Sequence, residues 1–110
     1  MKIKVLMMPA DRKAYITNIE DTLENLQRTV GGYIEAVKLS ADAVLVCNED
    51  GKLLGLPRNK NISGKLFKPD MIVGDCFICG CNGEDFTDIT DGAKRLFLAS
   101  CRAAWEENNE

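Results

Sequence analysis

Histidine does not occur in this sequence, and its absence excludes the side chain that most often acts as a general base. The Ser–His and Cys–His nucleophile pairs are excluded with it. A phosphate-binding loop is missing as well, because Gly80-Cys81-Asn82-Gly83 has neither the lysine nor the following helix of that motif. Carboxylates remain, but those at Asp50 and Glu84 adjoin turns, where acidic residues usually only face solvent. We therefore expect a protein that is not an enzyme and that uses no cofactor.

Basic charge and long apolar runs are also scarce. The 14 Lys and Arg residues stand against 17 Asp and Glu residues, and no Lys/Arg-rich block occurs. Affinity for nucleic acids depends on neutralising phosphates, so we expect no direct nucleic-acid binding. The apolar run 71–81 is shorter than the ~20 residues of a membrane-spanning helix. Pro9 interrupts the apolar stretch after Met1–Lys4, so the N-terminal segment lacks the pattern of a secretory signal. We therefore expect a cytoplasmic protein without a membrane partner.

Cysteine, in contrast, is well represented, with five residues. An odd number of cysteines in a chain without an export signal predicts reduced thiols rather than a disulfide framework. Cys76, Cys79 and Cys81, with Cys47 on a neighbouring strand, form the one candidate metal set. On a strand, however, Cys79 and Cys81 share one face while Cys76 points to the other, so they do not converge as zinc ligands. We expect buried free thiols and no bound metal.

Hydrophobic periodicity predicts several short strands. Ile3, Val5 and Met7 alternate with their neighbours until Pro9 ends the run. The predicted strands span residues 3–8, 15–19, 33–39, 43–47, 52–54 and 71–81. The turn Asn48-Glu49-Asp50-Gly51 would join two of them as a hairpin, with a left-handed glycine. Gly74, inside the last strand, marks a bulge or a point of close backbone approach.

Two segments carry helical signals. Asp21 and Glu24 make a near capping box before a stripe of Leu23, Leu26 and Val30, and Gly31 stands where a left-handed cap is wanted. The second helix begins after the N-cap candidates of residues 87–91 and continues to about Trp105. Its apolar stripe is Ala93, Leu96, Phe97, Ser100 and Ala104. These elements predict a single α+β domain over residues 1–110, with a mostly antiparallel sheet of four to five strands and one early and one C-terminal helix packed on it.

Five short segments form a pattern along the chain: GGYIEAV (31–37), NEDGKL (48–53), GLPRN (55–59), IVGD (72–75) and GEDF (83–86). Together they resemble an uncharacterised domain-of-unknown-function family of small phage, plasmid and bacterial proteins. The resemblance covers roughly residues 3–91 and implies a phage or mobile-element accessory protein without assigned chemistry. Its members usually carry Val, Ile or Ala on the last long strand, where this chain has Cys76, Cys79 and Cys81.

One polar constellation is a candidate binding site. Tyr33, Glu35, Asn48, Arg58 and Asn59 would surround a pocket beside the sheet. Arg58 would bind a phosphate or carboxylate group of a ligand, Tyr33 would stack on a ring of the ligand, and the asparagines would hydrogen-bond to its polar edges. Two interpretations of Glu35 stay open: it is solvated at an edge, or it is buried and paired with Arg58.

The function we expect is binding without catalysis. In this interpretation the chain is a phage or mobile-element accessory protein in the cytoplasm of a bacterial host cell, where it binds a host protein or a small nucleotide-like molecule and counters host defence. The alternative is a self-associating regulatory or structural module of a replication or transfer system. Its interface would use the C-terminal helix, which carries large apolar groups on more than one side, at Phe97, Leu98 and Trp105.

Overall fold

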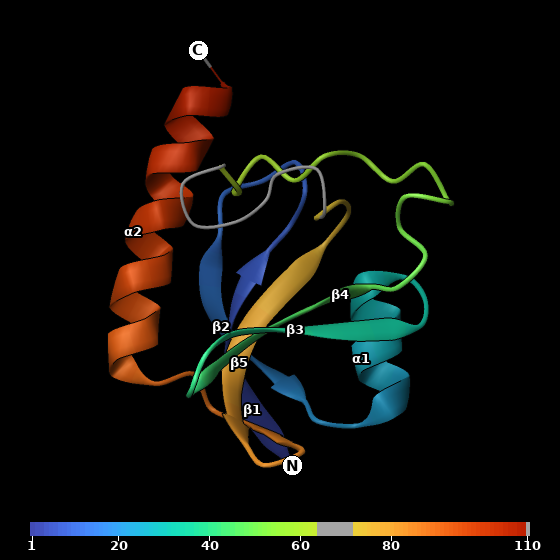
Figure 1. The fold of residues 1–110 in the computed structure, drawn as a ribbon, viewed down its shortest axis with the longest axis vertical. Coiled ribbons are helices and arrows are strands. Elements are labelled where there is room, and N and C mark those ends of the chain that lie inside the picture. Colours follow the sequence, from blue (N-terminus) through green and yellow to red (C-terminus); the bar gives the residue numbers. More distant parts are fainter. Residues whose placement is uncertain (64–71, 110) are drawn as a thin grey trace.

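The computed structural model describes residues 1–63 and 72–109. Within these residues, six strands form one antiparallel sheet in the order β2-β1-β5-β4-β3, and β6 pairs with β5 (Figure 1). The strands are β1 Lys2–Met8, β2 Tyr15–Glu20, β3 Ile34–Ser40, β4 Ala43–Asn48, β5 Cys76–Asn82 and β6 Asp85–Thr87. The helices are α1 Leu23–Val30 and α2 Asp91–Asn108, which confirms the predicted α+β class with one early and one C-terminal helix.

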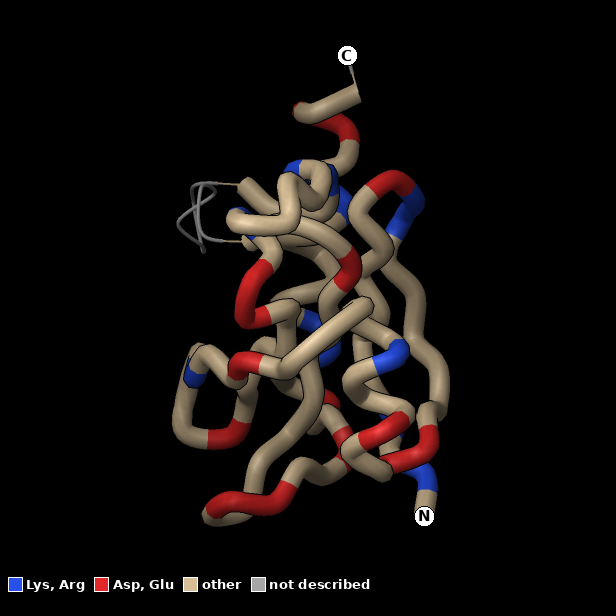
Figure 2. The backbone as a smooth tube through the Cα atoms, turned by 90° about the vertical axis from the view of Figure 1, so that its right-hand side faces the viewer, with Lys and Arg blue, Asp and Glu red and all other residues tan. Residues whose placement is uncertain are grey.

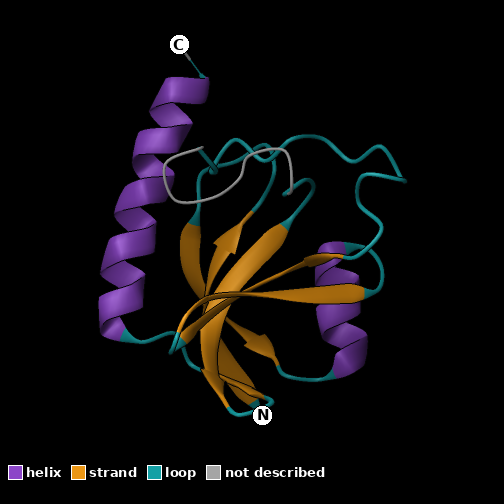
Figure 3. Cartoon of the chain, viewed as in Figure 1, coloured by secondary structure: helices purple, strands orange, loops and turns teal. Residues whose placement is uncertain are grey.

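The two helices cover opposite faces of the sheet, as Figure 3 shows. The central strands β1, β4 and β5 are therefore buried on both faces, and β4 has no exposed residue. Leu45 and Ile78 pack toward α2 with Phe97, while Val46 and Phe77 pack toward α1. This two-sided burial explains why these strands read as apolar runs rather than as an alternation of apolar and polar residues.

The first helix begins one residue later than a cap at Asp21 requires. Thr22 is the N-cap, and its Oγ1 accepts a hydrogen bond from the Asn25 N–H at 3.2 Å. The Asp21 N–H instead donates to the Met1 carbonyl at 2.8 Å, so the predicted Asp21–Glu24 capping box is wrong. Gly31 does form the predicted left-handed cap, with φ of 81° and its N–H bonded to the Gln27 carbonyl.

The segment after β4 does not return as a strand. The Leu54 N–H donates to the Asp50 carbonyl at 2.9 Å and the Leu56 N–H to the Gly51 carbonyl at 3.0 Å, so the chain coils through successive turns. The predicted hairpin into residues 52–54 is therefore wrong, because these backbone groups bond within the turn instead of forming a ladder. Gly51 also lacks the left-handed conformation expected of it.

The last long strand is shorter than predicted and begins at Cys76. Before it, Val73 makes an isolated antiparallel bridge with Arg58, and the Gly74 N–H donates to the Pro57 carbonyl at 2.7 Å. Gly74 has φ of 75°, and a Cβ there would lie 2.7 Å from Leu56 Cδ1. Of the two interpretations of this glycine, close approach is confirmed. Met71 and Gly64, which fall in the predicted strand and turn segments, lie outside the described residues.

The second helix extends past Trp105 to Asn108, and Thr90 caps its first turn by accepting from the Ala93 N–H at 3.1 Å. Its buried stripe runs through Ala93, Phe97, Cys101 and Ala104. Leu96, which was expected on this stripe, is exposed instead. The buried face continues from Phe97 to Cys101 and leaves Leu96 to one side of it. In the part of the chain that the structure describes, no helix has the length and hydropathy needed to cross a membrane.

Candidate functional site

The two asparagines of the predicted polar pocket serve the backbone. Asn59 is fully buried, and its Nδ2 donates to the carbonyls of Met8 and Gly74, both at 2.9 Å. Asn48 is buried as well: its Nδ2 donates to the Val30 carbonyl at 3.2 Å, and its Oδ1 accepts from the Asp50 N–H at 2.8 Å. Both side chains thus satisfy buried backbone groups that the irregular loops leave without regular partners.

The other three predicted pocket residues are exposed. Glu35 and Asn48 line the same shallow hollow of about 200 Å³, which Arg58 and Asn59 do not line. Tyr33 lies beside this hollow, since its carbonyl accepts from the Glu49 N–H at 2.8 Å. Glu35 and Arg58, both in the described part of the chain, form no ion pair with each other. The structure therefore brings Tyr33, Glu35 and Asn48 together but does not complete the predicted set.

The three candidate interface residues of α2 have different surroundings. Phe97 is buried in the core against the sheet, and Leu98 packs against the same core while half-buried. Phe97 is thus not available as a surface contact, because its ring supports the fold of this chain. Trp105 is half-buried near the end of α2, where it faces the hollow described next.

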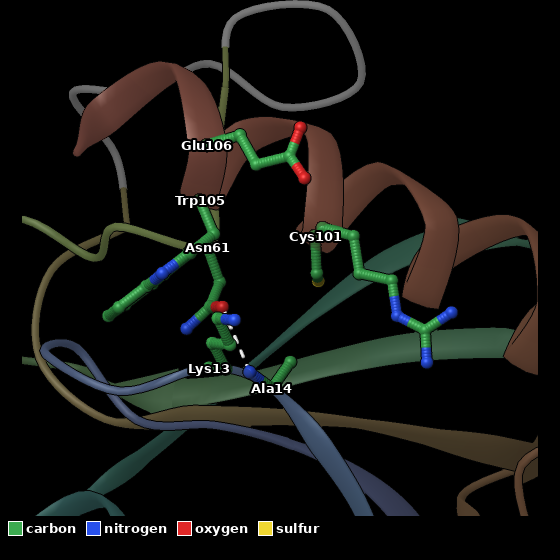
Figure 4. Close-up of a pocket in the computed structure, with 7 residues that line it drawn as sticks. Lys13, Ala14, Asn61, Cys101, Trp105 and Glu106 are labelled. Atoms are coloured by element: carbon green, nitrogen blue, oxygen red, sulfur yellow. Dashed lines mark hydrogen bonds between the residues drawn. The ribbon is translucent and has the colours of Figure 1, made fainter. Parts of the chain in front are cut away.

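A hollow of about 350 Å³ lies between α2 and the loop that joins β1 to β2 (Figure 4). We call it the α2 hollow. Its lining residues are Lys13, Ala14, Asn61, Cys101, Arg102, Trp105 and Glu106. Lys13 and Ala14 precede β2, Asn61 comes from the long loop after β4, and the remaining four belong to α2. Three segments that are far apart in sequence thus meet at this one place.

Asn61 fixes the loop side of the α2 hollow. Its Oδ1 accepts from the Ala14 N–H at 3.0 Å, the contact drawn in Figure 4. Its Nδ2 donates to the carbonyls of Pro9 at 2.7 Å and Arg12 at 2.8 Å. Because this buried amide has three partners, it holds the β1–β2 loop in one conformation beneath the helix.

Asn108 fixes the other side, near the end of α2. Its Nδ2 donates to the Lys60 carbonyl at 3.0 Å and to the Ile62 carbonyl at 3.3 Å. Lys60 in turn places its Nζ 5.9 Å from the centre of the Trp105 ring and 3.4 Å from Asn109 Oδ1. The last turns of α2 are therefore tied to the same loop that supplies Asn61.

Positive charge predominates at the α2 hollow. Lys13 and Arg102 line it, Lys60 lies over Trp105, and Glu106 is the one carboxylate among the described lining residues. Within the described part of the chain, none of these three cations forms an ion pair. Figure 2 shows that the rest of the backbone carries both acidic and basic positions. The hollow thus combines an aromatic ring with cations that form no ion pair among the described residues.

The four buried cysteines are poorly suited to nucleophilic chemistry, whereas Cys81, expected to be buried, is half-buried. Burial raises the pKa of Cys101, at the inner wall of the α2 hollow, to about 12 and that of Cys79 to about 12 as well. Burial also raises the pKa of Cys76 well above its ordinary value. Neutral thiols are poor nucleophiles, and among the described residues no cluster of three or more acidic, cysteine or histidine side chains is placed to hold a metal.

Most of the α2 hollow has no signal in the sequence. The sequence pattern indicates Trp105 only as an interface residue and does not indicate Lys13, Lys60, Asn61 or Arg102. These residues come from separate segments and form no motif, so only the tertiary fold brings them together. The available signal was weak: the single tryptophan of the chain stands near the end of an amphipathic helix that also carries Arg102.

Comparison with known sequences gives one result. A family described as "Domain of unknown function (DUF3846)" matches residues 1–100. The match includes the first half of α2, which the resemblance seen in the sequence had left out. No curated protein and no solved structure matches the chain.

Proposed function

The chain belongs to the DUF3846 family, a family of unknown function, and from its own residues we propose that it is a non-enzymatic protein that binds a small nucleotide-like ligand in the α2 hollow. The ligand class is an aromatic ring that carries a phosphate group. The observation that carries this proposal is the position of Trp105 beside Lys13, Lys60 and Arg102, which have no carboxylate partner within the described residues.

Each part of the α2 hollow corresponds to a part of such a ligand. The Trp105 ring offers a stacking surface, and base–aromatic stacking contributes about 1–3 kcal/mol per base. The Arg102 guanidinium presents a planar fork of donors that matches two phosphate oxygens, while Lys13 adds a second positive charge. The volume of about 350 Å³ is at the lower end of the roughly 300–1,000 Å³ range of small-molecule sites, which favours a mononucleotide over a larger cofactor.

Glu106 sets the orientation of the ligand. Its carboxylate lines the hollow among the cations and would repel a second phosphate group placed near it. A carboxylate accepts hydrogen bonds from ribose hydroxyls or from an exocyclic amine, so it suits the nucleoside end of the ligand. This arrangement favours a monophosphate over a di- or triphosphate.

Binding without turnover agrees with the chemistry of the lining residues. The sequence has no histidine, and the Cys101 thiol stays protonated near neutral pH because burial raises its pKa to about 12. A protein that holds a signalling nucleotide without converting it lowers the free concentration of that nucleotide. Such sequestration would suit a phage or mobile-element protein that counters host defence.

The tryptophan of the α2 hollow provides a direct test, because the chain contains only one. Titration with AMP, GMP, CMP and UMP is expected to quench Trp105 emission saturably for at least one of them. The matching nucleoside and inorganic phosphate alone are expected to bind at least tenfold more weakly, since each supplies half of the contacts. N-acetyltryptophanamide, titrated in parallel, corrects for absorption by the nucleotide. Absence of saturable quenching by all four monophosphates at millimolar concentration would refute the proposal.

A further inference from the structure

A second surface, at the turn after β4, leaves large apolar side chains in solvent. Leu53 is 88% exposed, Leu54 is 61% exposed and Tyr33 is 67% exposed. Leu53 lines the shallow hollow of Glu35 and Asn48, Leu54 follows it in the same turn, and the Tyr33 carbonyl bonds to the N–H of Glu49, which also lines that hollow. We call Tyr33, Glu35, Glu49, Leu53 and Leu54 the acidic corner. Single exposed leucines are common on protein surfaces, but a group of large apolar side chains marks an interaction site.

The turn that carries the two leucines is held in place by hydrogen bonds. Its backbone closes through the bonds from Leu54 N–H to the Asp50 carbonyl and from Leu56 N–H to the Gly51 carbonyl. Asn48 anchors the start of the turn by bonding both the Asp50 N–H and the Val30 carbonyl at the end of α1. The backbone that carries the exposed leucines is therefore held in place, which lowers the backbone entropy that a partner must remove on binding.

Negative charge surrounds these apolar groups. Glu35 and Glu49 line the shallow hollow, Asp50 belongs to the same turn, and Lys52 is the one cation among the described lining residues. Within the described part of the chain, none of these carboxylates forms an ion pair. A partner with positive charge next to an apolar group would complement both properties of this surface.

We propose that the acidic corner docks a basic amphipathic helix of another protein, with apolar side chains against Leu53, Leu54 and Tyr33 and with Lys or Arg against Glu35 and Glu49. The charge pattern argues against a second copy of this chain, because a symmetric contact would place the carboxylates of one copy opposite those of the other. The acidic corner shares no residue with the α2 hollow, so the proposal is independent of nucleotide binding.

A designed helical peptide, with leucine at positions i, i+3, i+4 and i+7 and lysine at the positions between them, is labelled with a fluorophore and tests this surface by fluorescence anisotropy. The peptide is expected to bind the wild-type chain, and the double variant Leu53→Ser/Leu54→Ser is expected to weaken binding at least tenfold. The control Leu96→Ser removes an exposed leucine from α2 and is expected to change the affinity less than twofold. Circular dichroism checks that each variant is folded.

A second pair of variants tests the charges without touching the apolar groups. Glu35→Gln/Glu49→Gln is expected to weaken peptide binding severalfold and to reduce its salt dependence, whereas Glu84→Gln, an exposed acid of another turn, leaves both unchanged. An analogous leucine–glutamate peptide is expected not to bind. The proposal is overturned if the leucine–lysine and leucine–glutamate peptides bind with equal affinity, or if neither double variant changes the affinity for the leucine–lysine peptide. It is also overturned if the wild-type chain is a dimer and Leu53→Ser/Leu54→Ser dissociates it, because a second copy would then occupy this surface.

Discussion

At the scale of single residues, buried asparagines replace regular secondary structure in the loops of this fold. Asn48, Asn59 and Asn61 are the buried polar residues among those described, and each amide bonds to backbone groups of distant segments. No buried side-chain nitrogen or oxygen of the described residues lacks a partner. The long loop after β4 thus owes its shape to a few side chains, two of which also position the surfaces proposed to bind.

Asn59→Ala is expected to lower the free energy of unfolding by roughly 2–4 kcal/mol, because it leaves the Met8 and Gly74 carbonyls and the Asn61 N–H without their partner in a fully buried site. Urea denaturation followed by circular dichroism measures this change. The exposed Asn18 of β2 provides the matched control, and Asn18→Ala should cost less than about 0.5 kcal/mol. An equal loss of unfolding free energy in the two variants would show that the hydrogen bonds of the Asn59 amide do not stabilise the fold.

The buried thiols predict a loss of stability in alkali. Burial raises the pKa of Cys101 to about 12 and that of Cys47 to about 11, whereas an unfolded cysteine ionises near about 8.5. The unfolded chain therefore releases protons first. The contribution of these thiols to the free energy of unfolding should be constant below about pH 8 and fall as the pH rises from about 8.5 toward 11. Urea titrations at several pH values measure the slope. A Cys101→Ala variant should show a shallower fall, and an identical slope would contradict the assignment.

At the scale of elements, the ends of the helices are set by side-chain caps. Thr22 caps α1 and Thr90 caps α2, each by accepting a hydrogen bond from the N–H three residues ahead. The cap of α2 also fixes Asp42, whose carboxylate accepts from Thr90 and Ser40, and these two hydrogen bonds lower its pKa. Each helix thus begins at a defined residue.

Thr22→Ala is expected to cost about 1 kcal/mol of unfolding free energy through loss of the N-cap bond. Asp21→Ala is the informative control, because Asp21 satisfies the sequence pattern of a cap but makes no cap bond in the structure. Thermal and urea denaturation of the two variants separate these alternatives. A larger loss of unfolding free energy for Asp21→Ala than for Thr22→Ala would support the N-cap at Asp21 that the sequence predicts.

Elements with a local signal could be predicted from the sequence. The strand pattern before Pro9, the left-handed cap at Gly31 and the stripe of Ala93, Phe97 and Ala104 each lie within a few residues of their cause. The turn after β4 could not be predicted, because its apolar Leu53 and Leu54 resemble a strand although both side chains are exposed. Arg58 and Asn59 look equally polar in sequence, yet one is exposed and the other is fully buried.

At the scale of the whole molecule, the sheet is a rigid layer between two helices, and the proposed binding surfaces belong to its connections. The α2 hollow combines the β1–β2 loop, the loop after β4 and the end of α2. The acidic corner combines the turn after β4 with Glu35 near the start of the edge strand β3. The central strands thus support the loops without taking part in binding, which is the usual division between scaffold and site.

Hydrogen exchange should reveal this division directly. The amides of the central strands, such as Leu6, Leu45 and Phe77, are expected to exchange only through global unfolding, because both faces of their strands are covered. Amides of the edge strands β2 and β3 should exchange faster by local opening. Mass spectrometry after proteolysis resolves these segments, and equal protection of central and edge strands would contradict the layered core.

The central claim is that the α2 hollow binds a nucleoside monophosphate through its cations, and isothermal titration calorimetry of three proteins tests it most directly. The wild-type chain is compared with Arg102→Gln, which removes the guanidinium that lines the hollow, and with Arg95→Gln, which makes the same change at an exposed position of α2 outside it. We predict that Arg102→Gln weakens binding roughly tenfold or more and that Arg95→Gln changes it less than twofold. Equal affinity in all three proteins, or no binding by the wild-type chain, would contradict the account.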